Sequence, residues 1–117
     1  QERRANQGGQ WIKDQGMKDW LAWMKKYYAN GDVADAYNVY GYTAAQALVH
    51  VLQLCGDRLT RDNVMKQATN LKNLELPMLL PGIRINTSPT DYYPIKQAQL
   101  QYFDGKQWVR FGEVIGP

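Results

Sequence analysis

Residues 39–55 read VYGYTAAQALVHVLQLC, and the rest of the chain is organised around this stretch. Its polar residues recur every three or four positions, so on a 3.6-residue helix they form one narrow stripe: Thr43, Gln46, His50 and Gln53. The other faces are apolar, and we therefore expect a core helix that is buried on most sides. Asn38 is expected to cap its N-terminus, and Gly56 its C-terminus.

The composition fits a single globular domain and excludes several classes of protein. The chain has 117 residues, of which 44% are hydrophobic and 21% charged, so it is neither wholly disordered nor collagen-like. The net charge is +3, but lysine and arginine are scattered rather than gathered in a stripe, so no nucleic-acid partner is expected. No apolar run is long enough to span a membrane, and no signal-peptide pattern occurs in this chain.

The residue types that carry catalysis are sparse. The single Cys55 excludes an internal disulfide and a zinc site of several thiolates, and its apolar neighbours predict a buried thiol. The one histidine, His50, belongs to the polar stripe and is expected to be solvated or hydrogen-bonded. There is no glycine-rich phosphate loop and no GxSxG motif, so we expect no catalytic residue, metal or cofactor.

Two further helices flank the central one. Residues 1–10 lack any period and are expected to be a loose lead-in. A helix is predicted from Asp14 onward, because its apolar residues recur with helical spacing: Met17, Trp20, Leu21, Met24, Tyr27 and Tyr28. A third helix is predicted to begin at the cap Thr60, with Leu59 packing on Val64 as a hydrophobic staple.

After residue 80 the period changes to two. Ile83 and Ile85 alternate with polar residues and predict a short strand, and residues 87–94, TSPTDYYP, must be a turn or a crossing segment. Residues 98–102 and 108–115 then predict a hairpin with Asp104-Gly105 in its turn. Leu100 faces Val109 under a two-residue loop and Phe111 under a four-residue loop. Such a hairpin needs a partner layer, so the chain taken alone is α+β and incomplete.

Four motifs together suggest a family. They are the YGYTAAQAL helix, the helix start GDRLTRDNV, the crossing segment LPGIRINTSPTDYYPI and the hairpin FDGKQWVRFGEVI. In this order the chain, from Trp11 to Ile115, resembles the C-terminal third of the periplasmic substrate-binding proteins of branched-chain amino acid ABC transporters. These proteins have the two-lobe α/β type 1 fold and close like a hinge on a small solute.

The resemblance implies a division of the chain and a set of partners. Residues 11–88 would hold the helical part of the N-terminal lobe with the last hinge strand, and residues 89–117 the crossing segment and the hairpin of the second lobe. The solute would meet an aromatic wall at Tyr37, with Asn38 and Tyr40 beside it. The missing two-thirds of the fold and the transporter permease would be partners of the intact protein, which would be periplasmic or lipid-anchored on the outer surface.

Two alternatives remain open, and two further expectations follow. The same fold serves ligand-sensing receptor ectodomains, and the chain could also be a truncated structural fragment that binds no solute. If residues 87–94 cross between lobes, they should absorb the hinge motion. Because the helices and the hairpin lack their partner layers, the chain by itself should expose apolar surface and self-associate.

Overall fold

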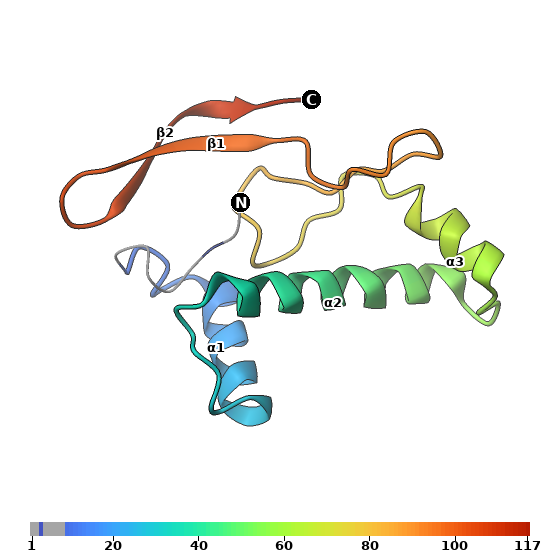
Figure 1. The fold of residues 1–117 in the computed structure, drawn as a ribbon, viewed down its shortest axis with the longest axis horizontal. Coiled ribbons are helices and arrows are strands. Elements are labelled where there is room, and N and C mark those ends of the chain that lie inside the picture. The colour runs from blue at the N-terminus through green and yellow to red at the C-terminus, as the bar shows by residue number, and fades with distance from the viewer. Residues whose placement is uncertain (1–2, 4–8) are drawn as a thin grey trace.

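The computed structural model describes residue 3 and residues 9–117. Three helices, α1 (Gln15–Tyr27), α2 (Ala36–Cys55) and α3 (Arg61–Ala68), precede a hairpin of β1 (Ala98–Phe103) and β2 (Trp108–Ile115). Helix α2 is the long axis, with α1 at its N-terminal end, α3 at its C-terminal end and the hairpin standing apart from the helices (Figure 1). The described residues thus form a small α+β arrangement with one two-stranded antiparallel sheet.

Helix α1 begins where the sequence predicts. The Asp14 carboxylate accepts a hydrogen bond from the Met17 backbone N–H at 2.8 Å, which satisfies one of the free donors of the first turn. The buried face is narrower than the apolar pattern suggests, because only Met17, Trp20 and Met24 are buried. Of the other residues of the predicted face, Tyr27 and Tyr28 are more than half exposed, and Leu21 is 37% exposed.

Helix α2 begins three residues earlier than predicted, and Asn38 is not its cap. Asp35 is the N-cap, and its carboxylate accepts from the Tyr37 backbone N–H at 2.9 Å. Asn38 lies in the first turn and uses its side-chain amide to donate to the Asp32 carbonyl at 2.8 Å. The acidic cap prevails because a carboxylate also interacts favourably with the positive end of the helix dipole. Gly56 ends the helix with a φ of 56°, as its position predicts.

The prediction that α2 is buried on most sides is wrong for this chain. Only Val39, Thr43, Val51 and Cys55 are buried. Large apolar residues elsewhere on the helix stay in contact with solvent and are about half exposed: Leu48 54%, Val49 52%, Leu52 39% and Leu54 47%. Two short helices and a few loops offer too little surface to surround a helix of 20 residues, so the apolar face is left without a partner layer.

The core lies where α1, the first turns of α2 and residues 77–85 meet. The most completely buried large side chains are Trp20, Val39, Met78, Leu79 and Ile83. Two prolines, Pro77 and Pro81, bracket the buried residues 78–80, so this loop enters the core without forming a helix or strand. A Cβ atom on Gly16 would lie 2.7 Å from the Pro77 carbonyl oxygen, so the close contact between α1 and this loop requires glycine.

Helix α3 has the predicted cap, and the predicted staple is not formed. Thr60 accepts from the Asn63 backbone N–H at 3.2 Å, while the Asn63 amide donates to the carbonyl of Arg58 at 2.8 Å. Leu59 is 65% exposed, because the helix turns Val64 toward the core instead. The free thiol of Cys55 is buried, as its apolar neighbours predict.

The predicted strand at residues 83–85 is reduced to one bridge. Ile85 and Leu74 exchange a pair of backbone hydrogen bonds at 2.9 and 3.0 Å, and no neighbouring pair continues the ladder. The inward alternation is correct, because Ile83 and Ile85 are both buried while Arg84 pairs with Glu75 near the surface.

The hairpin adopts the register of a four-residue loop. Leu100 pairs with Phe111 and Phe103 with Trp108, and the ladder shifts between Ala98 and Leu100. Asp104 ties the loop by accepting from the Lys106 and Gln107 backbone N–H groups, each at 2.8 Å. The predicted apolar face has no cover, since Leu100 and Phe111 are 47% and 48% exposed.

The chain exposes more surface than a compact domain of its mass. Its accessible surface is 8092 Å², whereas a compact monomer of 13.5 kDa exposes about 6,500 Å². Its radius of gyration is 15.8 Å, against about 13 Å for a compact chain of this length. Large apolar side chains on α2 and on the hairpin are among those that stay exposed, as expected of faces without a partner layer.

The cap assignment can be tested with two substitutions on neighbouring turns. We expect Asp35→Ala to lower the free energy of unfolding by about 1 kcal/mol, because it leaves first-turn N–H groups unsatisfied. Asn38→Ala removes an exposed side-chain bond and should cost less than about half as much. Urea unfolding followed by circular dichroism measures both, and a larger loss for Asn38→Ala would return the capping role to that residue.

Candidate functional site

A pocket of about 710 Å³ lies between α1, one face of α2 and residues 74–76. We call it the α1–α2 pocket. Its volume lies within the range of small-molecule sites, and its lining is mainly apolar and aromatic with a few polar groups. Its apolar and aromatic lining residues are Trp23, Met24, Tyr28, Tyr37, Gly41, Tyr42, Ala45, Val49, Leu74 and Leu76. Its polar lining residues are Asn38, Gln46, His50, Gln53 and Glu75.

Aromatic contacts join the two helices that form the pocket. The Trp23 ring on α1 meets the Tyr42 ring on α2 edge to face, with centroids 5.2 Å apart, and also contacts Tyr27 at 5.5 Å. Edge-to-face pairs of this kind add to the energy of simple burial. Small residues on α2, Gly41 and Ala45, leave the space in front of these rings open.

The polar stripe of α2 contributes Gln46, His50 and Gln53 to the pocket lining. Thr43 is 7% exposed, and Gln46 and His50 are half-buried in the pocket wall. Among the described residues, the hydroxyl of Thr43 and the Oε1 atom of Gln46 are buried without a hydrogen-bond partner. An unpaired buried acceptor is costly, so the Gln46 oxygen is available to a donor on a bound molecule.

Burial also affects the ionisation of one lining residue. The pKa of the Tyr42 phenol is raised, first by burial and then by the negative charge of Asp19. Tyr42 therefore stays neutral at physiological pH and keeps its hydroxyl proton.

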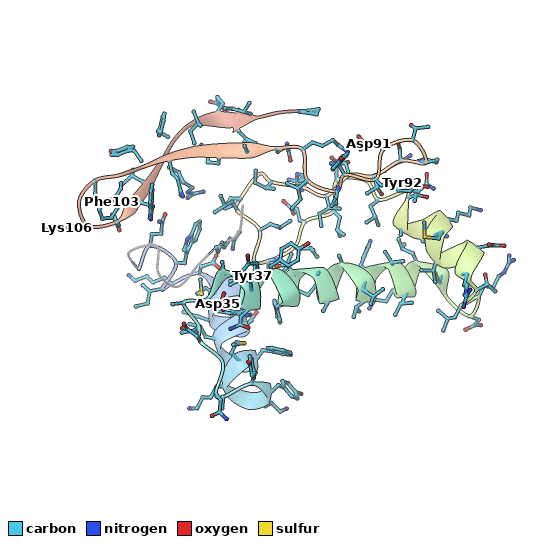
Figure 2. All side chains as sticks on the ribbon, in the orientation of Figure 1. Asp35, Tyr37, Asp91, Tyr92, Phe103 and Lys106 are labelled. Carbon is cyan, nitrogen blue, oxygen red and sulfur yellow. The ribbon has the colours of Figure 1, made fainter. Side chains whose placement is uncertain are left out.

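The three residues predicted to meet a solute separate into two groups. Tyr37 and Asn38 line the α1–α2 pocket, whereas Tyr40 is not part of its lining and is 63% exposed. Tyr37 is 83% exposed at the first turn of α2, next to the cap Asp35, so it does not belong to the core (Figure 2).

Gln46 and His50 are the lining residues that the sequence interpretation missed. The signal was present, because four polar residues at intervals of three and four on an otherwise apolar helix must share one direction. The spacing fixes that common direction but leaves open whether it leads to solvent or to a pocket.

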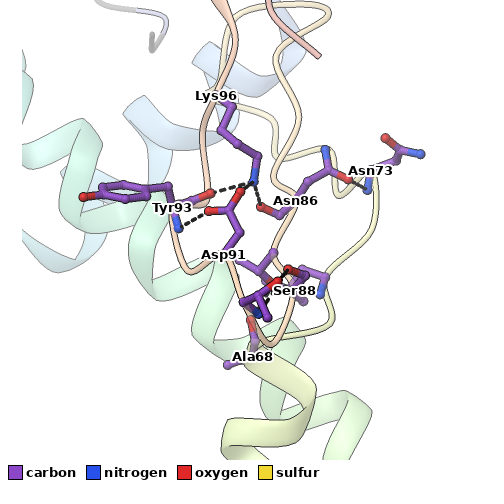
Figure 3. Close-up of polar contacts among 10 residues, drawn as sticks. Ala68, Asn73, Asn86, Ser88, Asp91, Tyr93 and Lys96 are labelled. Carbon is purple, nitrogen blue, oxygen red and sulfur yellow. Dashed lines mark hydrogen bonds and ion pairs between the residues drawn. The ribbon is translucent and has the colours of Figure 1, made fainter.

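Residues 87–94, which the sequence predicts to be a turn or a crossing segment, form a closed loop held by one lysine. The Lys96 ammonium forms an ion pair with Asp91 at 3.0 Å and donates to the carbonyls of Asn86 at 2.9 Å and Tyr93 at 3.0 Å (Figure 3). The Asn86 N–H also donates to the Pro94 carbonyl at 3.0 Å, so the two ends of the segment lie side by side. Hydrogen bonds from Lys96 and from the Tyr93 N–H lower the pKa of the Asp91 carboxyl.

The start of the crossing segment is tied to the end of α3. The Thr87 hydroxyl donates to the Ala68 carbonyl at 2.7 Å and accepts from the Leu71 N–H at 2.9 Å. The Thr87 backbone N–H donates to the Leu71 carbonyl, also at 2.9 Å. These bonds fix residue 87 to the helical part of the chain, so any rotation of the hairpin relative to the helices must use bonds after it.

Metal-binding clusters and membrane-spanning helices are both absent from the described part of the chain. No group of three or more His, Cys, Asp or Glu residues there is arranged to hold a metal ion. None of its helices combines the length and apolar character needed to cross a membrane.

Comparison with known protein families, curated proteins and solved structures finds no match to this chain. The geometry of the pocket and the residues of the four motifs therefore carry the functional argument.

Replacing Lys96 tests the lysine-held loop. In Lys96→Met we expect the pKa of Asp91 to rise toward its ordinary value, because the first cause of its depression is removed. A lowered folded-state pKa stabilises the fold above the carboxyl's ordinary pKa of about 4, and this stabilisation is lost as the pH falls below it. The variant should therefore show a weaker loss of stability on the acid side.

NMR titration of the Asp91 carboxyl measures the pKa, and thermal melting between acid and neutral pH measures the stability. Lys106→Met, which removes a lysine charge from the hairpin loop, serves as the matched control. An unchanged Asp91 pKa in Lys96→Met would contradict the assignment.

Proposed function

We propose that this chain is part of the solute-binding component of an ABC importer, of the branched-chain amino acid type with the two-lobe type 1 fold. The observation that carries the proposal is the α1–α2 pocket, which includes Tyr37 and Asn38 at the start of α2. The resemblance expects an aromatic wall at that turn. The four sequence motifs, in their family order, support the same assignment.

The uncovered surfaces are consistent with this proposal. In a two-lobe protein the exposed apolar face of α2 would cover a sheet, and the hairpin would join the second lobe. A solute in the cleft would then bring both lobes together, and the permease would recognise the closed form. The segment between Thr87 and the hairpin would carry the last crossing.

The lining of the pocket favours a solute with an apolar or aromatic body. Trp23, Tyr28 and Tyr37 offer apolar contact, and Asn38 and Gln46 offer hydrogen bonds. Apolar amino acids, amides and aromatic acids fit that chemistry. The wall is open, with Tyr37 83% exposed, so the second half of the grip must come from elsewhere in the intact protein.

The isolated chain should not bind such solutes measurably. One aromatic wall contributes about 1 to 3 kcal/mol, whereas a micromolar complex needs about 8 kcal/mol and must also offset the loss of translational and rotational freedom. Isothermal titration calorimetry of the chain with a panel of amino acids and aromatic acids checks this expectation. Tight binding by the chain alone would show that the pocket is complete without a second lobe.

The sharper test uses the intact protein, identified by reading the gene upstream of the codon for Gln1. An in-frame segment encoding the rest of two lobes is expected, and an unrelated upstream sequence would overturn the proposal. In that protein, Tyr37→Ala should weaken solute binding roughly ten- to a hundredfold, since about 1.4 kcal/mol is a factor of ten.

Tyr40→Ala is the matched control for Tyr37→Ala. It removes the same side chain one helical turn away, from a position that is exposed and outside the pocket lining. Its affinity should stay within about twofold of the unmodified protein. Equal losses in the two variants would mean that Tyr37 acts through the stability of α2 and not through the solute.

A further inference from the structure

We propose that β1 is an edge through which two copies of this chain dimerise. The β1 strand of one copy pairs antiparallel with the β1 strand of its partner, and the two hairpins become one four-stranded sheet. This pairing needs neither a solute nor any further segment of chain. In the intact protein of the proposed function a second lobe would compete for the hairpin, so the pairing is proposed for the 117-residue chain, and its failure would leave the solute-binding tests unaffected.

The outer edge of β1 has no partner in the described structure. The sheet contains two strands in the order β1–β2. Within residues 9–117, no backbone hydrogen bond joins β1 to any segment other than β2. Residues 100–103 are all exposed, with Tyr102 at 51% and Phe103 at 56%. A row of free N–H and C=O groups beside exposed side chains is a template for another strand.

The sequence of β1 favours pairing with itself. Residues 97–103 read QAQLQYF and contain no charged residue, no proline and no glycine. Natural edge strands usually carry such residues as protection against pairing. Glutamines alternating with apolar and aromatic residues are instead the composition of segments that stack on identical copies. Two identical uncharged strands meet without electrostatic repulsion, which is not true of a charged edge.

A two-fold axis at Gln101 gives a complementary register. On the apolar face, Leu100 then lies opposite the partner's Tyr102, an aliphatic-aromatic pair of the kind that stabilises sheets. On the other face, Gln101 lies opposite the partner's Gln101, and two amides can satisfy each other. The two apolar faces become one continuous surface.

The outer edges of the resulting sheet are β2 strands, and these are protected. Strand β2 carries Arg110 and Glu113, and its Gly112 has a φ of 70° where the ladder shifts. The Gln99 amide donates to the carbonyls of Phe111 and Gly112 at 2.7 and 3.0 Å and so fixes this irregularity. Charges and a bulge stop further pairing, so the assembly closes at two copies.

The chain as a whole exposes more surface than a compact monomer. Its accessible surface of 8092 Å² exceeds that of a compact monomer by about 1,600 Å², and a standard interface covers about 800 Å² on each partner. The exposed side chains of residues 100–103 belong to the surface that a second copy can cover.

Sedimentation equilibrium of the 117-residue chain tests the proposal, with one glutamate variant in β1 and one on α2. Gln101→Glu favours the hairpin itself, because residue 101 pairs with Arg110, but it places two carboxylates opposite each other across the two-fold axis. We expect at least about a tenfold rise in the dimer dissociation constant. Gln53→Glu is the same substitution at an exposed position on α2, outside the proposed interface, and should change the constant less than about threefold.

Cysteine cross-linking in a Cys55→Ser background tests the register independently. Gln101→Cys should form an intermolecular disulfide on mild oxidation, since directly opposed Cβ atoms lie about 5 Å apart. Lys106→Cys in the exposed hairpin loop should not, because its two copies would lie at opposite ends of the joined sheet. A monomer at all concentrations up to about 100 μM, polymers larger than two, or equal cross-linking at both positions would overturn the proposal.

Discussion

Helix α2 carries apolar residues around most of its circumference, and the rest of the chain covers only one side of it. Its buried contacts are the four residues Val39, Thr43, Val51 and Cys55, while leucines elsewhere on the helix stay about half exposed. The well-packed core therefore gathers at one end, where α1 and residues 77–85 enclose Trp20.

The partial cover of α2 also explains where the pocket forms. Small residues on α2 face α1 across a gap bridged by the Trp23–Tyr42 contact, and residues 74–76 close one side. Gln46 and His50 of the polar stripe line this pocket together with aromatic residues of α1 and α2. A binding site with apolar walls and a few amides is the natural result, and it suits a small solute held between this layer and a second one.

The part between helices and hairpin is more firmly held than its irregular backbone suggests. Thr87 fixes it to α3, and Lys96 draws Asn86, Asp91 and Tyr93 together. The hairpin beyond it runs roughly along the direction of α2, with Phe103 and Lys106 at its far end (Figure 2), and the Gln10 side chain donates to the Trp108 carbonyl at 2.8 Å. The molecule thus combines a fixed centre with two uncovered surfaces, one helical and one β, which are available to different partners.

The local elements of this protein follow from its sequence alone. Periodicity predicts the three helices and the hairpin, Thr60 and Gly56 mark two helix ends, and alternation places Ile83 and Ile85 inward, because these choices depend on neighbours in the chain. The family resemblance named Tyr37, Asn38 and Tyr40, of which the first two line the α1–α2 pocket. The sequence pattern wrongly predicted Asn38 as the N-cap of α2 and wrongly predicted that Leu59 packs on Val64. Several nearby residues could fill each role, so the local pattern does not decide between them.

Only the tertiary structure decides which faces are covered. Helical spacing defines the polar stripe of α2, but whether Gln46 meets solvent or a pocket depends on where α1 and residues 74–76 lie. The hairpin register, with Leu100 opposite Phe111, depends on the Asp104 side chain and the Gln99 contacts that stabilise a four-residue loop and a bulge. Burial is a property of pairs of elements, so a pattern on one element fixes its faces without fixing their environment.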